Sequence, residues 1–136
     1  MTLPESAVVV AWTPGATTVR WSGPAGDVEK AYELPPRDVL AWRERGETLV
    51  LVVEALDSAP FTRSDNAVVH LADGSELYRL RPPRDLLRDP NDVHGFHLAL
   101  PQDGRPLLII VTRNAGDFQG RIDLETGDIV EINTWR

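Results

Sequence analysis

Short apolar runs, in which apolar and polar residues tend to alternate, recur along the whole chain and are separated by turn-forming residues. An alternation of period two is typical of β-strands, because successive side chains point to opposite faces of a sheet. Asp73-Gly74, Asp103-Gly104 and Thr126-Gly127 separate neighbouring runs, and residues of these types accept the positive φ that a tight hairpin needs. The pattern predicts an all-β fold in which consecutive strands are antiparallel neighbours.

We expect about eleven antiparallel strands in total. Most of them follow directly from the alternation: Ala7–Trp12, Thr17–Trp21, Val28–Leu34, Leu49–Ala55, Ala67–Leu71, Glu76–Leu80, Gly95–Leu100, Leu107–Thr112, Phe118–Leu124 and Asp128–Asn133. The remaining one lies in Pro35–Gly46, where a proline in the first turn and a glycine just past the end are also compatible with a helix. A short helical turn is compatible with Pro83–Arg88, where Asp89-Pro90 would end it.

An internal repeat organises these strands. Tyr32–Leu40 returns as Tyr78–Leu87 with one inserted residue, and the run Leu49–Val53 after Gly46 corresponds to Leu107–Val111 after Gly104. Further on, Val69–Gly74 corresponds to Ile122–Gly127. The correspondences divide a single domain of residues 1–136 into three β-meander copies, approximately residues 6–36, 37–83 and 84–136. In the third copy the counterpart of Pro35–Gly46 alternates and turns like a hairpin, so we favour a strand there.

A meander of this length, with an Asp-Gly or Thr-Gly turn between its last two strands, resembles the blade of a β-propeller, and Ile122–Gly127 is similar to the turn of many propeller repeats. The resemblance implies four-stranded copies, of which the first lacks one strand. Closed propellers have four or more blades, so the edges of three copies must be covered. Either each chain is a partial propeller that joins other chains in a ring, or the meanders form a small barrel or sandwich. For a monomer we favour the second arrangement.

Composition narrows the classes of function. The 136 residues include 21 acidic and 14 basic ones, and the formal net charge of −7 disfavours contact with nucleic-acid phosphates. Cysteine is absent, which excludes disulfides, thiolate metal ligands and cysteine nucleophiles. The apolar runs are far shorter than a membrane span, and Met1–Ser6 lacks the basic and apolar regions of a signal peptide. We therefore expect no nucleic-acid partner, no membrane partner and a cytoplasmic location.

Two segments interrupt the repeat, Leu56–Asn66 and Arg81–His94. Function tends to reside in such added segments, because the scaffold does not need them. Trp135, close to the end of the chain, is a further candidate for contact with a partner. The predicted binding residues are Phe61, Arg63, Asp65, Arg84, Arg88, Asp92, His94 and Trp135.

The residue patterns indicate neither catalysis nor metal binding. His94 and His97 are three positions apart, and on a regular strand their side chains would point to opposite faces, which is the wrong arrangement for shared ligation of a metal. No serine lies in a Gly-x-Ser-x-Gly motif. Strand residues rather than a helix follow Gly23–Gly26, so this turn offers no helix N-terminus to a phosphate. We expect no catalytic residue, no metal and no cofactor.

Three hypotheses about function remain. The first, which we favour, is a non-enzymatic all-β domain that binds a protein partner or itself, in a homo-oligomer that hides its open sheet edges. The second is an acidic immunity or antitoxin protein that neutralises a basic toxin. The third is a small-ligand protein or metal-dependent enzyme that uses His94, His97 and Asp92 around a barrel mouth.

Overall fold

The computed structural model describes residues 8–56, 64–83 and 85–135. In that part of the chain, eleven strands form three antiparallel sheets, and the strands of each sheet are hydrogen-bonded in chain order. The all-β class predicted from the alternation is therefore confirmed. The first sheet contains β1 (Val9–Ala11), β2 (Thr18–Gly23) and β3 (Gly26–Ala31). The second contains β4 (Asp38–Glu44), β5 (Glu47–Val53), β6 (Ala67–Leu71) and β7 (Glu76–Leu80). The third contains β8 (Val93–Gln102), β9 (Arg105–Thr112), β10 (Phe118–Ile122) and β11 (Ile129–Thr134).

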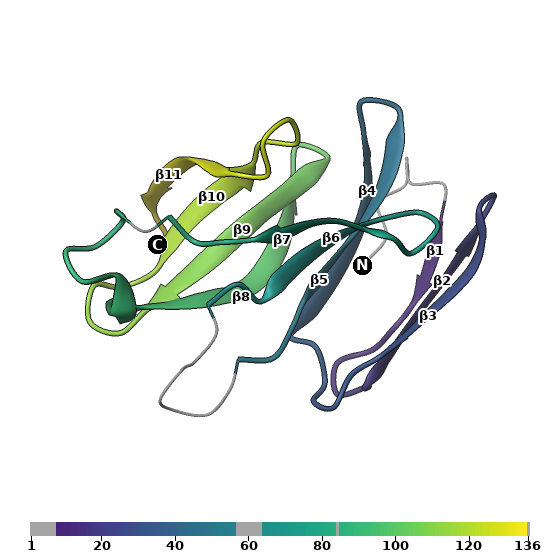
Figure 1. The fold of residues 1–136 in the computed structure, drawn as a ribbon, viewed down its shortest axis with the longest axis horizontal. Coiled ribbons are helices and arrows are strands. Elements are labelled where there is room, and N and C mark those ends of the chain that lie inside the picture. The colour runs from purple at the N-terminus through teal and green to yellow at the C-terminus, as the bar shows by residue number, and fades with distance from the viewer. Residues whose placement is uncertain (1–7, 57–63, 84, 136) are drawn as a thin grey trace.

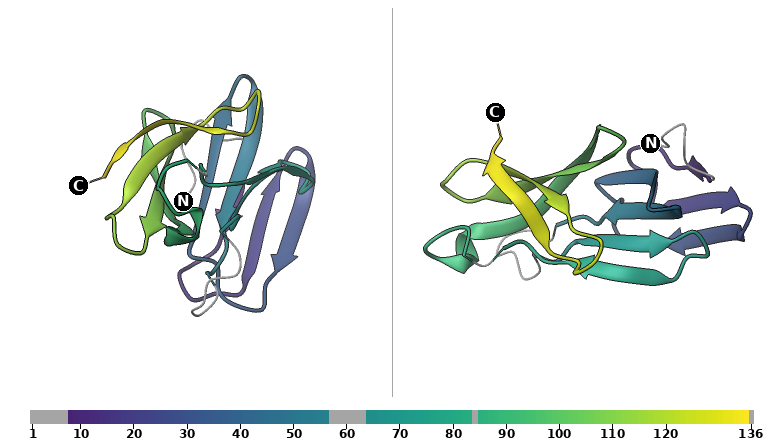
Figure 2. Two further views of the ribbon diagram at one scale, coloured as in Figure 1. Left: turned by 60° about the vertical axis from the view of Figure 1, so that its left-hand side comes forward. Right: turned by 90° about the horizontal axis from the view of Figure 1, so that it is seen from above.

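The second sheet lies between the other two, as Figures 1 and 2 show. One cluster of buried apolar residues joins it to the first sheet, and another joins it to the third. Strands β4 and β5 are consequently buried on both faces, which explains why Leu49–Val53 is an uninterrupted apolar run. Each sheet is open in its strand order, so the described strands form stacked layers and not a closed barrel.

The second and third sheets are copies of one unit. Both begin with a hairpin whose two turn residues have positive φ, Arg45-Gly46 in one and Asp103-Gly104 in the other. When the two turns are matched, Leu40 corresponds to Leu98, and Leu49–Val53 on β5 corresponds to Leu107–Val111 on β9. The predicted equivalence of these two runs is confirmed, and so is the strand interpretation of Pro35–Gly46.

The contacts between neighbouring sheets are also repeated. Trp21 of the first sheet donates its indole N–H to the carbonyl oxygen of Ala72 at 2.9 Å, just before the β6–β7 turn. Tyr78 of the second sheet donates its hydroxyl to the carbonyl oxygen of Leu124 at 2.7 Å, at the β10–β11 turn. The glycine of each turn, Gly74 or Gly127, packs closely against the preceding sheet. The turns that mark the repeat in the sequence are thus the docking points of the stack.

In Pro83–Arg88 the Leu86 N–H donates to the carbonyl oxygen of Pro83 at 3.4 Å and forms a single turn, while Arg84 lies outside the described residues. A 3₁₀ helix forms later, at Pro90–Asp92, and the Asp89 side chain caps it by accepting a hydrogen bond from the Asn91 N–H at 3.0 Å. Proline suits the first position of a helix because its missing N–H would have no partner there. Asp89-Pro90 therefore begins the helical turn instead of ending one.

Candidate functional site

A hollow of about 310 Å³ lies beside β8, the free edge strand of the third sheet. We call it the β8 hollow, and it is lined by Arg37, Leu56, His94, His97, Val111 and Asp117. The second sheet supplies Arg37 and Leu56, which flank β4 and β5, and the third sheet supplies the other residues. The hollow thus lies where the connections of one sheet meet the edge of the next.

Both histidines line this hollow, which contradicts the expectation that they point to opposite faces. The reason is two β-bulges in β8, at Val93–Gly95 and at Phe96–Leu98, and each histidine is the extra residue of one bulge. Val93, Phe96 and Ala99 remain in the core in spite of the bulges. A bulge re-aims side chains at a sheet edge, so a spacing that would separate two side chains on a regular strand brings them together here.

Arg37 and His97 form the polar centre of the hollow. The Arg37 Nε donates to the carbonyl oxygen of His97 at 3.3 Å, and the Nη2 contacts the His97 Nδ1. Because a guanidinium can only donate, Nδ1 is the acceptor and the ring proton lies on Nε2. Burial and the charge of Arg37 lower the pKa of His97 below its ordinary value, so the ring is neutral at pH 7.

The two added segments meet, as the sequence alone could not show. A second, smaller hollow of about 200 Å³ is lined by Ser64 of the first segment and by Pro82, Pro83, Pro90, Asn91 and Val93. Near it, the buried Asn66 side chain donates to the carbonyl oxygen of Phe96 at 2.8 Å and accepts from its N–H at 2.8 Å. Asn66 therefore pairs with the edge of β8 as a strand residue would.

An ion pair holds the base of the first added segment. Arg79 on β7 donates to both carboxylate oxygens of Glu54, at 2.8 and 3.1 Å, and to the carbonyl oxygen of Asp65 at 2.8 Å. The hydrogen bonds to Glu54 raise the pKa of Arg79. Burial, with the nearby charge of Glu54, raises the pKa of Tyr32 to about 12. Arg79 has a structural role, because it connects Glu54 and Asp65, which lie at the two ends of the segment.

The predicted binding residues do not form one site. Phe61, Arg63 and Arg84 lie outside the described residues. Asp65 and Asp92 contribute backbone carbonyls to hydrogen bonds with Arg79 and Arg113. Arg88 is exposed. His94 lines the β8 hollow, and the Trp135 N–H donates to the carbonyl oxygen of Asp117, another residue of that hollow, at 3.0 Å.

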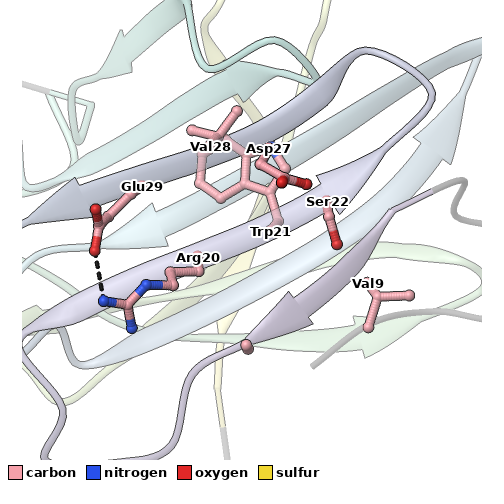
Figure 3. A pocket seen from close by; sticks show the side chains of 8 residues that line it. Val9, Arg20, Trp21, Ser22, Asp27, Val28 and Glu29 are labelled. Carbon is pink, nitrogen blue, oxygen red and sulfur yellow. Dashed lines mark hydrogen bonds and ion pairs between the residues drawn. The ribbon is translucent and has the colours of Figure 1, made fainter.

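The two ends of the stack present different faces. The outer face of the first sheet, shown in Figure 3, holds a hollow of about 590 Å³ whose outward side chains include Arg20, Asp27 and Glu29. Arg20 and Glu29 are paired at 2.5 Å and are more than half exposed. Such an exposed pair adds little stability. Apart from Val9, which is 70% exposed, and Ala11, the outward residues of this face are polar.

On β8 and β9 the outer face of the third sheet is apolar, whereas on β10 the same face carries Gln119 and Arg121. We call this the third-sheet face, and it consists of Leu98, Leu100, Leu107, Ile109 and Val111. Their equivalents in the second sheet are buried beneath the third sheet: Leu40, Trp42, Leu49, Leu51 and Val53. In the third sheet Leu107 and Ile109 are also buried, whereas Leu98, Leu100 and Val111 remain partly exposed. Val130, 37% exposed, is paired with Arg121 and lies on this same face.

Arg121 crosses the third-sheet face. It stands on β10, and its guanidinium donates to the carbonyl oxygen and the side-chain oxygen of Gln102, at the end of β8, at 2.9 and 2.6 Å. Strand β9 lies between β10 and β8, so the aliphatic part of Arg121 must cross β9 to reach Gln102. This arginine is only 8% exposed.

Sequence reasoning missed Arg37, Asp117 and the third-sheet face. Arg37 precedes a strand in the sequence far from His97, so nothing local indicates that they meet. The third-sheet face could have been predicted, because Leu107–Val111 is as apolar as Leu49–Val53, its equivalent in the second copy. A strand that is apolar on both faces needs a partner on each face.

Within the described residues, no group of three or more histidine and acidic side chains is placed to hold a metal ion. Among those residues there is also no helix long and apolar enough to cross a membrane. In comparisons with known proteins, no family model, no curated protein and no solved structure matches the chain.

Proposed function

We propose that the chain is a non-enzymatic protein-binding domain that associates with a second copy of itself through the third-sheet face. The observation that carries the proposal is the contrast between the two ends of the stack. Leu98 and Leu100 occupy positions that are fully buried in the second sheet, yet they are partly exposed here. In repeat proteins the terminal units usually present a polar outer face, as the first sheet does and the third does not.

The polarity of the faces selects the geometry of the assembly. A ring of chains would place the third-sheet face of one copy on the first sheet of the next, where Arg20, Asp27 and Glu29 would lose water. Two third-sheet faces match each other, because each buries the apolar surface of the other. The expected assembly is a dimer with twofold symmetry, in which the same patch contacts itself.

The size of the face sets the strength of association. The residues of the third-sheet face stand on β8 and β9, and two strands spaced by about 4.8 Å, each some 20–25 Å long, present on the order of 200–250 Å² per copy. This is far below the roughly 800 Å² per partner of a standard interface, so the dimer is weak. The formal charge of −7 on each copy opposes association, and added salt should strengthen it by screening.

Sedimentation equilibrium over a range of concentrations tests the proposal. The wild-type chain should pass from monomer to dimer, and Leu98→Asp should raise the dimer Kd at least tenfold, because it places a carboxylate in the contact. Val9→Asp is the matched control, since Val9 is 70% exposed on the polar face of the first sheet and should leave the Kd unchanged. A chain that stays monomeric up to about 1 mM contradicts the proposal.

We also propose that the domain is cytoplasmic, which its short apolar runs support, and that its sheets are propeller-like blades, which the stacking of the meanders supports. The toxin-neutralising alternative differs in its prediction: it needs a carboxylate-rich contact, so Asp27→Asn and Glu29→Gln would weaken binding to a basic partner while Leu98→Asp would not.

A further inference from the structure

The two bulges of β8 have no counterpart in β4, although both strands begin a copy of the same unit. β4 pairs with β5 residue for residue from Asp38 to Glu44. β8 reaches the same kind of turn with two additional residues, His94 and His97. At the first bulge Leu56 and Asn66 pack closely against Gly95, while Phe96 and Ala99 keep the core positions that Val39 and Ala41 occupy in the second sheet. Bulges of this kind are typical of sheet edges beside binding sites.

The β8 hollow is lined by a cationic, an anionic and two aliphatic side chains. Arg37 supplies a permanent positive charge, and its contacts with His97 occupy part of the guanidinium fork and fix its direction. Asp117 supplies a carboxylate from the third sheet, and Leu56 and Val111 supply apolar surface. The ring of His97 adds an N–H donor. A volume of about 310 Å³ is at the lower end for small-molecule sites and would hold roughly ten water molecules.

We propose that the β8 hollow binds a free amino acid with an aliphatic side chain. The ligand carboxylate pairs with Arg37, its ammonium group pairs with Asp117, and its side chain packs on Leu56 and Val111. One cation, one anion and an apolar floor match the three parts of such a ligand, whereas a plain carboxylate would leave Asp117 opposite a negative charge. The Arg37–His97 contact makes His97 a positioning residue for the guanidinium.

Isothermal titration with L-leucine and three relatives tests each part of the assignment. Leucinamide lacks the carboxylate, N-acetyl-L-leucine lacks the ammonium group, and glycine lacks the side chain. L-leucine should bind, and each relative should bind at least tenfold more weakly, because each leaves one group of the hollow without its complement. Absence of leucine binding overturns the proposal. Binding of N-acetyl-L-leucine as tight as that of leucine overturns the assignment to an amino acid.

Two variants link the ligand groups to the residues. Arg37→Gln should weaken leucine binding and abolish the preference for leucine over leucinamide, and Asp117→Asn should abolish the preference over N-acetyl-L-leucine. Arg20→Gln is the control, because this arginine is exposed on the first sheet and should leave the affinity unchanged. If the Arg37 or Asp117 variant keeps the wild-type preferences, the hollow is not the site.

Arg37 is exposed, so a glutamine there should leave the fold intact, and a circular dichroism spectrum checks this. Val111 belongs to both the hollow and the third-sheet face, so leucine binding is measured at a protein concentration below the dimer Kd, where the result does not depend on self-association. Leu98→Asp should weaken dimerisation and leave the affinity for leucine unchanged. Arg37→Gln should weaken leucine binding and leave the dimer Kd unchanged. Failure of one proposal is therefore distinguishable from failure of the other.

Discussion

The second and third sheets have nearly the same strands and turns, but their surroundings differ. The second sheet is packed between two neighbours, and Leu40 on β4 is completely buried. Its equivalent on β8, Leu98, is partly exposed, because among the described residues no further sheet packs on that side. The comparison teaches that one apolar pattern serves two purposes. In the middle of the stack it forms the core, and at the end of the stack it forms a surface that can contact another molecule.

The largest expected effect comes from truncating the two equivalent leucines. Leu40→Ala should cost about 2–5 kcal/mol of unfolding free energy, because it removes a fully buried side chain and leaves a cavity. Leu98→Ala should cost about 1 kcal/mol or less in the monomer, because water already reaches that side chain. Urea unfolding at a concentration below the dimer Kd measures both values. Equal losses would contradict the claim that the third-sheet face is uncovered.

A second comparison concerns two glycines with the same backbone conformation. Gly104 in the β8–β9 turn and Gly127 in the β10–β11 turn have φ of 74° and 79°. A Cβ at Gly104 would meet nothing within 4 Å, whereas one at Gly127 would lie 2.5 Å from the Tyr78 ring. Gly104→Ala should therefore cost about 1 kcal/mol, the price of a left-handed conformation. Gly127→Ala should cost about 1–3 kcal/mol more, because it also separates the second and third sheets.

Thermal unfolding of the two variants at one pH measures this difference. A similar loss of stability in both would show that Tyr78 does not pack on the turn. Gly74→Ala provides an independent check at the junction of the first and second sheets, where the added Cβ would lie 2.8 Å from Val28. It should resemble Gly127→Ala rather than Gly104→Ala.

The smallest expected effect is a dependence of stability on pH. Burial lowers the pKa of His70, which is 6% exposed beside Trp21, and the folded chain therefore favours the neutral ring. The unfolded chain takes up a proton at the ordinary pKa of about 6.5. The contribution of His70 to stability is consequently complete above that pH and is lost as the pH falls below it.

Unfolding free energies measured on both sides of pH 6.5 should show this loss. His70→Gln should reduce the dependence on pH more than His97→Gln does, because His97 is less buried although its pKa is also lowered. A wild-type stability that rises on acidification through this range would contradict the assignment of both rings as neutral. His70 lies at the junction of the first and second sheets, and His97 lies on the edge strand β8, so the two variants compare a buried histidine with one at a sheet edge.

Much of the fold was predictable because its signals are local. Alternation located the strands, and residues that tolerate positive φ located the turns at Gly74, Gly104 and Gly127. The internal repeat settled Pro35–Gly46, where local signals alone also allowed a helix. The helix at Pro90–Asp92 was missed, because the repeat is interrupted there and gave no second copy to compare.

The candidate site was less predictable because it depends on contacts between distant segments. His94 was identified from its place in an added segment, but the bulges that turn it and His97 toward one hollow are a property of pairing with β9. Arg37 and Asp117 carry no local signal, since each acquires its role from a neighbouring sheet.

The strands, the turns and the likeness of the second and third copies can be read from the residues along the chain, because these features depend on side-chain alternation and on backbone conformations within a few residues. Which copies of the apolar pattern are covered, and which side chains share the β8 hollow, follows from the packing of the sheets. Burial and proximity are properties of packed sheets, and strands with the same pattern differ in both according to what lies against them.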